Sequence, residues 1–309
     1  MMVYTLITLW ILSALPILFE KRILRMAVHL GIYSLITSII FLIFGAPDVA
    51  LAEASVSIFL TILIITCFEK YYNLKDFNAK IEWIKWGQYI LLAIFTLILF
   101  FLFIHFVPIS ETNTYSKVQY LTHFMYDVGG ENAVTAIYLG YRLYDTVFEA
   151  LMLLIAAVAV SHLSWHKGAL ATQEIRPIRI SNQAINIINL ISPLLLVFGV
   201  YLTAYGHLSP GGGFQGGVVI ATFFVCRYMV RNTYQMSVKQ LLRIEKFIFA
   251  GIMLLAVSIV FLGLYAYFPP IIAPLLQNIY LVSMNIFIGA KVALGFVLLS
   301  YRFIAIERA

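Results

Sequence analysis

Apolar runs of about 20 residues, the length that crosses the hydrocarbon core of a bilayer as a helix, recur along the whole chain. Helix-breaking residues separate these runs. Gly45-Ala46-Pro47 ends one run, because proline cannot continue a helical hydrogen-bond ladder. Hydrophobic residues make up 62% of the 309 residues and charged residues 11%, whereas about a quarter of a soluble domain is charged. We therefore predict an all-α, polytopic membrane protein.

The runs and breakers predict about nine transmembrane helices. They are expected at residues 2–19, 23–44, 48–68, 86–107, 144–164, 185–206, 213–230, 246–268 and 279–304. No basic segment and cleavage site precede the first run, so we expect it to be a retained helix. The mixed polarity of residues 131–144 predicts a helix lying at the membrane interface.

Lysines and arginines alternate between the connections. Seventeen of the twenty fall in segments on one face, Lys117 and Arg142 fall on the other, and Lys291 lies inside a span. The positive-inside rule then places the N-terminus outside and the C-terminus in the cytoplasm. The net charge of +6 is explained by topology, so the sequence gives no reason to expect nucleic-acid binding.

Ionisable side chains within spans are costly, at about 2.5–3.5 kcal/mol near a helix centre, and are functional candidates for that reason. Six residues qualify: His29, Asp48, Glu53, Asp145, Glu149 and Lys291. For His29, a hydrogen-bonded core histidine is an equally good interpretation.

The carboxylates form two pairs. Asp48 directly follows Pro47, where it fits a cap at an outer helix end. Glu53 lies five residues, or about 7.5 Å, deeper, so capping does not explain it. Asp145 and Glu149 share one helix face at i and i+4, and Asp145 fits an interfacial cap. We expect Glu53 and Glu149 to serve a Na⁺ or H⁺ path, with a candidate Na⁺ site near them.

Lys291 lies in the last span between Gly289 and Gly295, which permit close approach of another helix. It needs a counter-ion or must lose its proton, so it is either a static ion-pair partner or a member of a relay.

The segment "GHLSPGGGFQGG", residues 206–217, lacks the Gly-Lys-Ser/Thr of a phosphate loop and follows no strand. So much glycine indicates sharp bends or close backbone approach. His207 within it is a candidate for a proton path or an interfacial histidine. Cys67 and Cys226 have no metal or redox spacing and are interpreted as core residues.

Three motifs resemble one family of ion-transport subunits. "GAPDVALAEASV" resembles the "GAPDVALTE" signature of the large subunit of Mrp-type cation/proton antiporters, and equally a small subunit of energy-converting membrane-bound hydrogenases. "ENAVTAIYLGYRLYDTVFEALMLL" is similar to the module that follows, and "GHLSPGGGFQGGVVIA" with "FIGAKVALG" is similar to the B-type antiporter subunit. Ala52 replaces the expected threonine, and Leu143 an expected glycine, but the four carboxylates are retained.

This resemblance implies a fusion of modules. We expect a three-helix module at 1–85, a two-helix module at 86–165, a cytoplasmic linker at 166–184 and a four-helix B-type module at 185–309.

The resemblance also implies a function. The chain is expected to be a Na⁺/H⁺ antiport subunit in a ferredoxin-dependent membrane-bound hydrogenase- or sulfur-reductase-type complex, because its first two modules are not joined to a large antiporter-like subunit. The alternatives are a subunit of a stand-alone Mrp antiporter and a structural adaptor with no ion path. No redox cofactor or catalytic site is expected in this chain. Its expected partners are antiporter-like membrane subunits and hydrophilic iron–sulfur subunits, in the cell membrane of a bacterium or archaeon.

Overall fold

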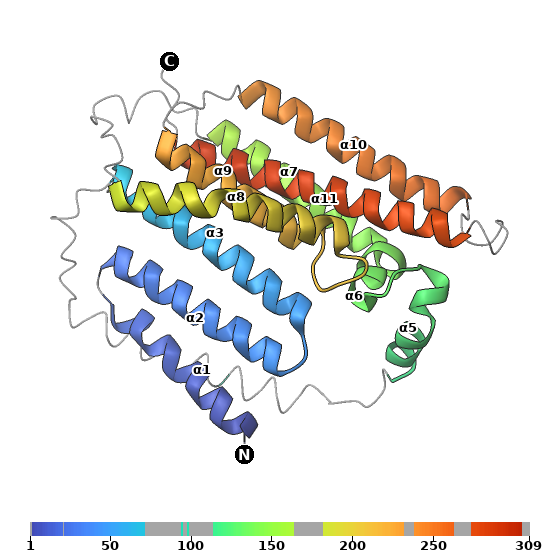
Figure 1. Ribbon diagram of the computed structural model, residues 1–309, viewed down its shortest axis with the longest axis horizontal. Helices are drawn as coiled ribbons and strands as arrows, with labels where there is room; N and C mark the ends of the chain where they lie inside the picture. Colours follow the sequence, from blue (N-terminus) through green and yellow to red (C-terminus); the bar gives the residue numbers. More distant parts are fainter. Residues whose placement is uncertain are drawn as a thin grey trace.

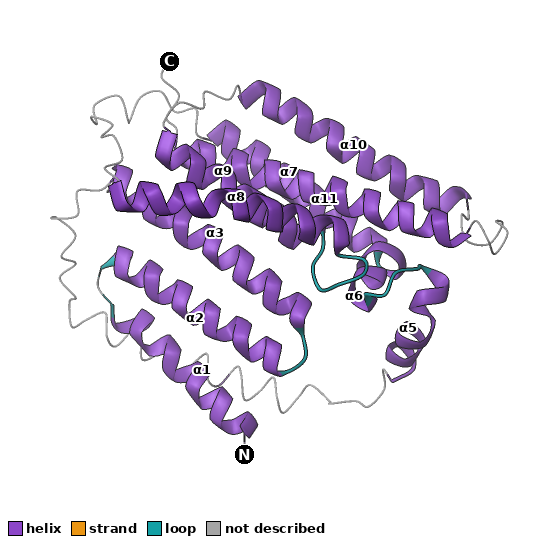
Figure 2. Ribbon diagram, in the orientation of Figure 1, coloured by secondary structure: helices purple, strands orange, loops and turns teal. Residues whose placement is uncertain are grey.

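The computed structural model describes residues 2–20, 22–71, 94, 98, 114–163, 182–231, 238–262 and 273–304. Every regular element in this part of the chain is helical (Figure 2), which confirms the all-α prediction. The elements are α1 (Met2–Phe19), α2 (Ile23–Ile43), α3 (Pro47–Tyr71), α5 (Thr114–Asp127), α6 (Ala133–Ala136), a π-helix (Ile137–Tyr141), α7 (Leu143–Leu163), α8 (Asn182–Tyr205), α9 (Gly213–Arg231), α10 (Val238–Leu262) and α11 (Ala273–Ile304).

The long helices form one bundle with α9 and α11 at its centre (Figure 1). Helix α9 packs against α3, α8 and α11, while α11 also packs against α7 and α10. Helices α1, α2 and α3 form a row that reaches the centre through α3. The short α5 and α6 lie together at one end of the bundle (Figure 1). This end carries the candidate site.

Five of the described helices are long and apolar enough to cross a membrane. The spans are Leu24–Ile43, Pro47–Thr66, Leu143–Val160, Ile185–Tyr205 and Pro274–Ser300. Helix α1 contributes a shorter apolar stretch, Thr8–Phe19. The chain is therefore a multi-pass membrane protein. The span expected at 86–107 lies outside the described residues except for Ile94 and Ile98, so the count of nine spans stays a prediction.

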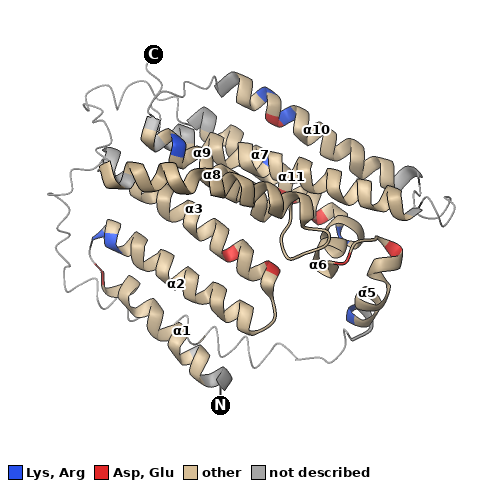
Figure 3. Cartoon of the chain, viewed as in Figure 1, with Lys and Arg blue, Asp and Glu red and all other residues tan. Residues whose placement is uncertain are grey.

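Basic residues gather at one end of the bundle, at the start of α2, the end of α9 and the start of α10 (Figure 3). The acidic residues of α3 lie toward the opposite end (Figure 3). This distribution agrees with the alternation seen in the sequence, and the orientation derived from it stays a prediction.

Two helices begin earlier than expected. Helix α11 begins at Ala273, because the first turn of a helix tolerates Pro274. Helix α10 begins at Val238, eight residues before the expected span. The charged sequence "VKQLLRIEK" continues the helix there, so Glu245 belongs to a helix and not to a connecting turn.

Glycine lets the central helices approach one another closely. A methyl group added at Gly217 of α9 would lie 2.6 Å from the carbonyl oxygen of Gly289 in α11. One added at Gly295 would lie 2.9 Å from the side chain of Leu153 in α7. The glycines on both sides of Lys291 therefore serve helix contacts, as their spacing indicated.

Candidate functional site

Asp48 lies in the first turn of α3 and is 7% exposed. Its Oδ1 accepts hydrogen bonds from the side-chain amide of Asn132 at 3.0 Å and from the backbone N–H of Gly211 at 2.9 Å. The carboxylate thus joins α3 to the segment before α6 and to the glycine-rich loop before α9. This is a wider role than the local helix cap that the sequence suggested.

Asn132 extends these contacts. Its amide nitrogen also donates to the carbonyl oxygens of Gly206 at 3.1 Å and Ser209 at 3.0 Å. Its Oδ1 accepts the N–H of Val134 at 2.9 Å and so caps α6. A single buried amide therefore fixes both the start of α6 and the course of the glycine-rich loop.

The segment expected to lie at the interface is at one end of the bundle, and one of its faces is buried there. Ala136 and Leu139 are fully buried, and residues Ile137–Tyr141 form a π-helix. A π-helix leaves carbonyl groups without their usual partners, and such elements occur frequently at functional sites. Here the hydroxyl of Thr146 donates to the carbonyl of Tyr138 at 2.5 Å, and that of Tyr280 to the carbonyl of Leu139 at 2.7 Å.

Tyr138 connects this segment to the two central helices. Its hydroxyl donates to Oδ1 of Asn285 in α11 at 2.8 Å, and the same oxygen accepts the N–H of Gly213 at 3.1 Å. Asn285 is fully buried, and its amide nitrogen has no hydrogen-bond partner among the residues described. The polar network therefore runs from α3 through α6 to α9 and α11.

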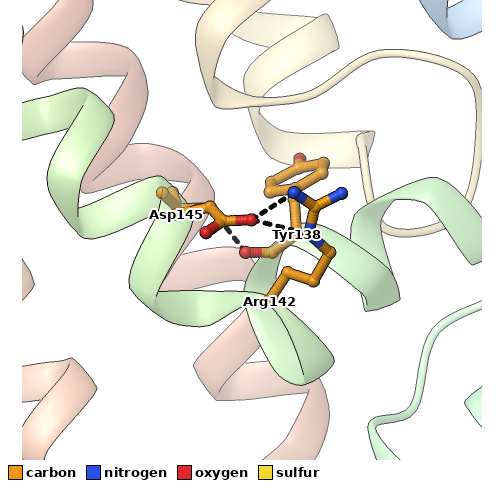
Figure 4. A network of polar contacts seen from close by, with 4 residues as sticks. Tyr138, Arg142 and Asp145 are labelled. Atoms are coloured by element: carbon orange, nitrogen blue, oxygen red, sulfur yellow. Dashed lines mark hydrogen bonds and ion pairs between the residues drawn. The ribbon is translucent and has the colours of Figure 1, made fainter.

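Asp145 lies beside this network but faces outward. Its carboxylate pairs with the guanidinium of Arg142, at 2.5 Å from Nη2 and 2.6 Å from Nε (Figure 4). The side chains are 58% and 63% exposed. An exposed ion pair of this kind contributes little to stability.

Glu53 is half-buried on α3 and accepts a hydrogen bond from the hydroxyl of Ser34 in α2 at 2.5 Å. Its carboxylate therefore faces the α2–α3 contact. It does not line the cavity described next, so the structure places Glu53 and Glu149 in different surroundings.

Glu149 and Lys291 line one cavity of about 290 Å³ between α7, α9 and α11. Its remaining walls are mainly apolar, including Leu153, Phe214 and Phe296. Glu149 lies at its edge, exposed on the surface of the chain and without a hydrogen-bond or ion-pair partner in the described part.

Lys291 is fully buried and pairs with Glu245 of α10, with Nζ 2.5 Å from Oε1. Glu245 is 1% exposed, and its second oxygen has no hydrogen-bond partner in the part of the chain that the structure describes. Its importance was missed in the sequence because it lies between Arg243 and Lys246, where it resembles part of a charged cytoplasmic turn.

His207 lies in the glycine-rich loop and is 8% exposed. Its carbonyl oxygen accepts the N–H groups of Glu131 at 2.9 Å and Asn132 at 3.1 Å. Its Nδ1 has no hydrogen-bond partner within the described ranges. Burial lowers the pKa of His207, while a hydrogen bond to the backbone of Ala204 and the charge of Glu131 oppose that shift. The structure does not bring His207 into the cavity lined by Glu149 and Lys291.

The site thus has two parts. The polar network, built on Asp48, Asn132 and Asn285, fixes backbone positions. The cavity is lined by a carboxylate with no partner among the described residues and by a paired ammonium group. Within the described residues, no three His, Cys, Asp or Glu side chains converge in a way that would hold a metal ion.

Comparisons with known proteins confirm the resemblance inferred from the motifs. Residues 184–301 match the family model for a domain related to the MnhB subunit of Na⁺/H⁺ antiporter, and residues 8–72 match the model for MbhD, a subunit of MBH. A putative antiporter subunit mnhA2 from Staphylococcus aureus (strain JH9) is 31% identical over 149 residues. That alignment covers 47% of this chain and 18% of the relative, so the chain spans less than a fifth of the length of the curated relatives it matches.

Two solved structures share the fold. The Mrp complex from Dietzia sp. DQ12-45-1b matches with a TM-score of 0.68 at 17% identity, over 94% of this chain and 34% of the matched chain. The membrane-bound sulfane sulfur reductase, an archaeal respiratory membrane complex, matches with a TM-score of 0.53 at 24% identity, over 70% of this chain and 98% of the matched chain. Nearly the whole fold therefore also occurs within one chain of an Mrp complex.

Proposed function

We propose that this chain, with its MnhB-related and MbhD-like segments, is a membrane subunit of an ion-translocating Na⁺/H⁺ antiport module. It works within a ferredoxin-dependent respiratory complex of the membrane-bound hydrogenase or sulfur reductase type. The likeness to nearly the full length of a sulfane sulfur reductase chain supports this choice of complex. The complex lies in the cell membrane of a bacterium or archaeon.

The observation that carries the proposal is the position of Glu149. It lies within a spanning helix, at the edge of a cavity, exposed on the surface of the chain and unpaired in the described part. A carboxylate facing lipid at that depth is costly. Another subunit must therefore cover this face, and the covered cavity then holds a carboxylate that can bind a proton or Na⁺.

In this function the chain supplies the ion path and no redox chemistry. Glu149 and Glu53 take up and release the ion, and Lys291 adjusts the charge of the cavity. Asp48, Asp145 and His207 hold or border the outer end of the path. Na⁺ and H⁺ are the transported ions, while iron–sulfur clusters and the hydrogenase-like or reductase chemistry belong to hydrophilic partner subunits.

The first test identifies the partners. Gentle detergent extraction of the native protein, followed by mass spectrometry, is expected to recover antiporter-like membrane subunits together with hydrophilic subunits that carry cysteine clusters. Recovery of antiporter-like membrane subunits alone would instead make the assembly a secondary Na⁺/H⁺ antiporter of the Mrp type.

The second test addresses the path. In membrane vesicles, Glu149→Gln is expected to abolish Na⁺-dependent proton exchange by the assembled complex. Lys246→Met is the control, because Lys246 is exposed and outside the cavity. Unchanged exchange in an assembled Glu149→Gln complex would refute the proposed path.

A structural adaptor is the second candidate function, favoured by the hydrogen bonds that use Asp48 to join three segments. An adaptor predicts that Glu149→Gln leaves transport intact and that Asp48→Ala prevents assembly. A Glu149→Gln complex that assembles normally but does not transport would exclude it.

A further inference from the structure

Glu245 and Lys291 form a buried ion pair in which only one of the two carboxylate oxygens of Glu245 accepts a described hydrogen bond. The Lys291 ammonium lies 2.5 Å from Oε1 of Glu245, both side chains are at most 1% exposed, and Oε2 of Glu245 is buried without a hydrogen-bond partner among the described residues. Burying two charges is costly, and the cost is offset only when the remaining hydrogen-bonding positions are satisfied. This pair does not meet that condition, so stability alone gives a weak reason for its presence.

The pair is connected to the candidate ion path. Lys291 lines the same cavity as Glu149, and both project into it from different helices, α11 and α7. Water fits a cavity of about 290 Å³, since roughly 30 Å³ is the share of one molecule in the liquid. Water inside the cavity would connect Glu149 to Lys291, which contacts Glu245 directly.

The two carboxylates approach Lys291 from opposite ends of the bundle. Glu149 lies six residues from the start of α7, about 9 Å along its axis. Glu245 lies seven residues from the start of α10, about 10 Å along it, and α10 begins at the end of the bundle opposite to the start of α7 (Figure 1). Lys291, in the interior of α11, contacts Glu245 and lines the cavity together with Glu149.

The surroundings offer few other charges. The acidic and basic side chains that the structure describes on α7 and α11 are Asp145, Glu149 and Lys291, and Asp145 is paired with Arg142 at the outer surface. On α10, Arg243 and Lys246 are exposed.

We propose that Glu245 is a further member of the ion path, the inner partner of a proton relay that runs from Glu149 through the water of the cavity to Lys291 and Glu245. In the step within the pair, an N–H bond of the Lys291 ammonium breaks and an O–H bond forms on Glu245. A neutral amine and a neutral carboxylic acid result, and the amine then accepts a proton from the cavity. This inference rests on the proposed antiport function.

The test separates a relay from a static pair. In Glu245→Leu/Lys291→Met, both charges are removed together, so no single charge is left buried without its partner. Replacing a buried ion pair by apolar residues is often neutral or stabilising, so the double variant is expected to assemble. In proteoliposomes its Na⁺-driven proton flux should fall on the order of 100-fold, the lower end of the contribution of a positioned proton-transfer group.

Lys246→Met serves as the matched control, since it removes a lysine next to Glu245 in sequence but exposed, and its flux should equal that of the wild type. A double variant that assembles and transports within twofold of the wild type overturns the inference. If Glu149→Gln is inactive in the same experiment, the proposed function stands while the relay falls.

A spectroscopic measurement tests the inference without transport, using Glu245→Gln, which keeps the size of the side chain. Infrared difference spectra of the complex across a pH step through neutrality should show a carboxylic-acid C=O band in the wild type that this variant lacks. If the wild type shows no band that Glu245→Gln lacks, the relay is overturned. This measurement still decides the question if the double variant fails to assemble, or if the wild-type complex shows no Na⁺-dependent proton flux.

Discussion

Removing the carboxylate of Asp48 should destabilise the glycine-rich loop by an amount that follows from the two hydrogen bonds of that carboxylate. In Asp48→Ala, the amide of Asn132 retains the carbonyls of Gly206 and Ser209 as acceptors. The N–H of Gly211 loses the carboxylate oxygen that it contacts at 2.9 Å. Hydrogen bonds to charged groups contribute about 1.5–3 kcal/mol, and a buried donor left without a partner costs about 1–3 kcal/mol.

We therefore expect a loss of about 3 kcal/mol in local stability for Asp48→Ala. Because about 1.4 kcal/mol corresponds to a factor of ten, amide hydrogen exchange at Gly211 should become roughly 100-fold faster. Mass spectrometry of a peptide covering residues 206–212 measures this rate in the assembled complex. Asp48→Asn retains an acceptor oxygen at the same place, so it should lose only about 1 kcal/mol.

The order of the two variants tests the reasoning. Equal exchange rates in Asp48→Asn and Asp48→Ala would show that the acceptor oxygen does not hold the loop. An unchanged rate at Gly211 in Asp48→Ala would refute the hydrogen bond itself. A peptide from α11 serves as an internal control, since Asp48 makes no described side-chain hydrogen bond to that helix.

Two further predictions concern packing and pH. Gly217→Ala places a methyl group 2.6 Å from the Gly289 backbone and should lower the free energy of unfolding by about 1–3 kcal/mol. Gly251→Ala is the control and should lower it less, because its methyl group meets the movable ring of Phe287. Equal shifts of the melting temperature in the two variants would contradict this account. Because burial lowers the pKa of His207, the unfolded chain binds a proton first as the pH falls below about 6.5, so stability should be full above that pH and decline below it. Melting curves should show this decline in the wild type but not in His207→Gln, and the same decline in both proteins would exclude His207 as its cause.

Hydropathy located most of the charged residues that matter, because a charge inside an apolar run is visible without any tertiary information. Lys291 and Glu149 were found in this way. Glu245 was not, since its neighbours Arg243 and Lys246 are also charged, and only the fold shows that one of the three side chains is buried.

Long-range partners could not be predicted for a related reason. The local sequence at Asp48 is that of a helix start, and a cap was the simplest interpretation. Its partner Gly211 is 163 residues away, and no pattern in either segment indicates the other. The π-helix could not be predicted from the sequence either. Its carbonyls accept hydrogen bonds from the hydroxyl of Thr146, eight residues further along the chain, and from the hydroxyl of Tyr280 in α11.

The hydrogen bonds of Asp48 have a consequence for how such an assembly is built. Asp48, Asn132 and Gly211 belong to the three predicted modules, one residue in each, and their hydrogen bonds cross from module to module. If the modules were separate polypeptides, the same bonds would lie at subunit boundaries and their formation would depend on encounter in the membrane. A covalent connection replaces that encounter by an effective concentration that does not depend on how much of each polypeptide is made. If the three predicted modules are fused in this way, their stoichiometry is fixed at synthesis, while their mutual contacts remain of the kind found between neighbouring subunits.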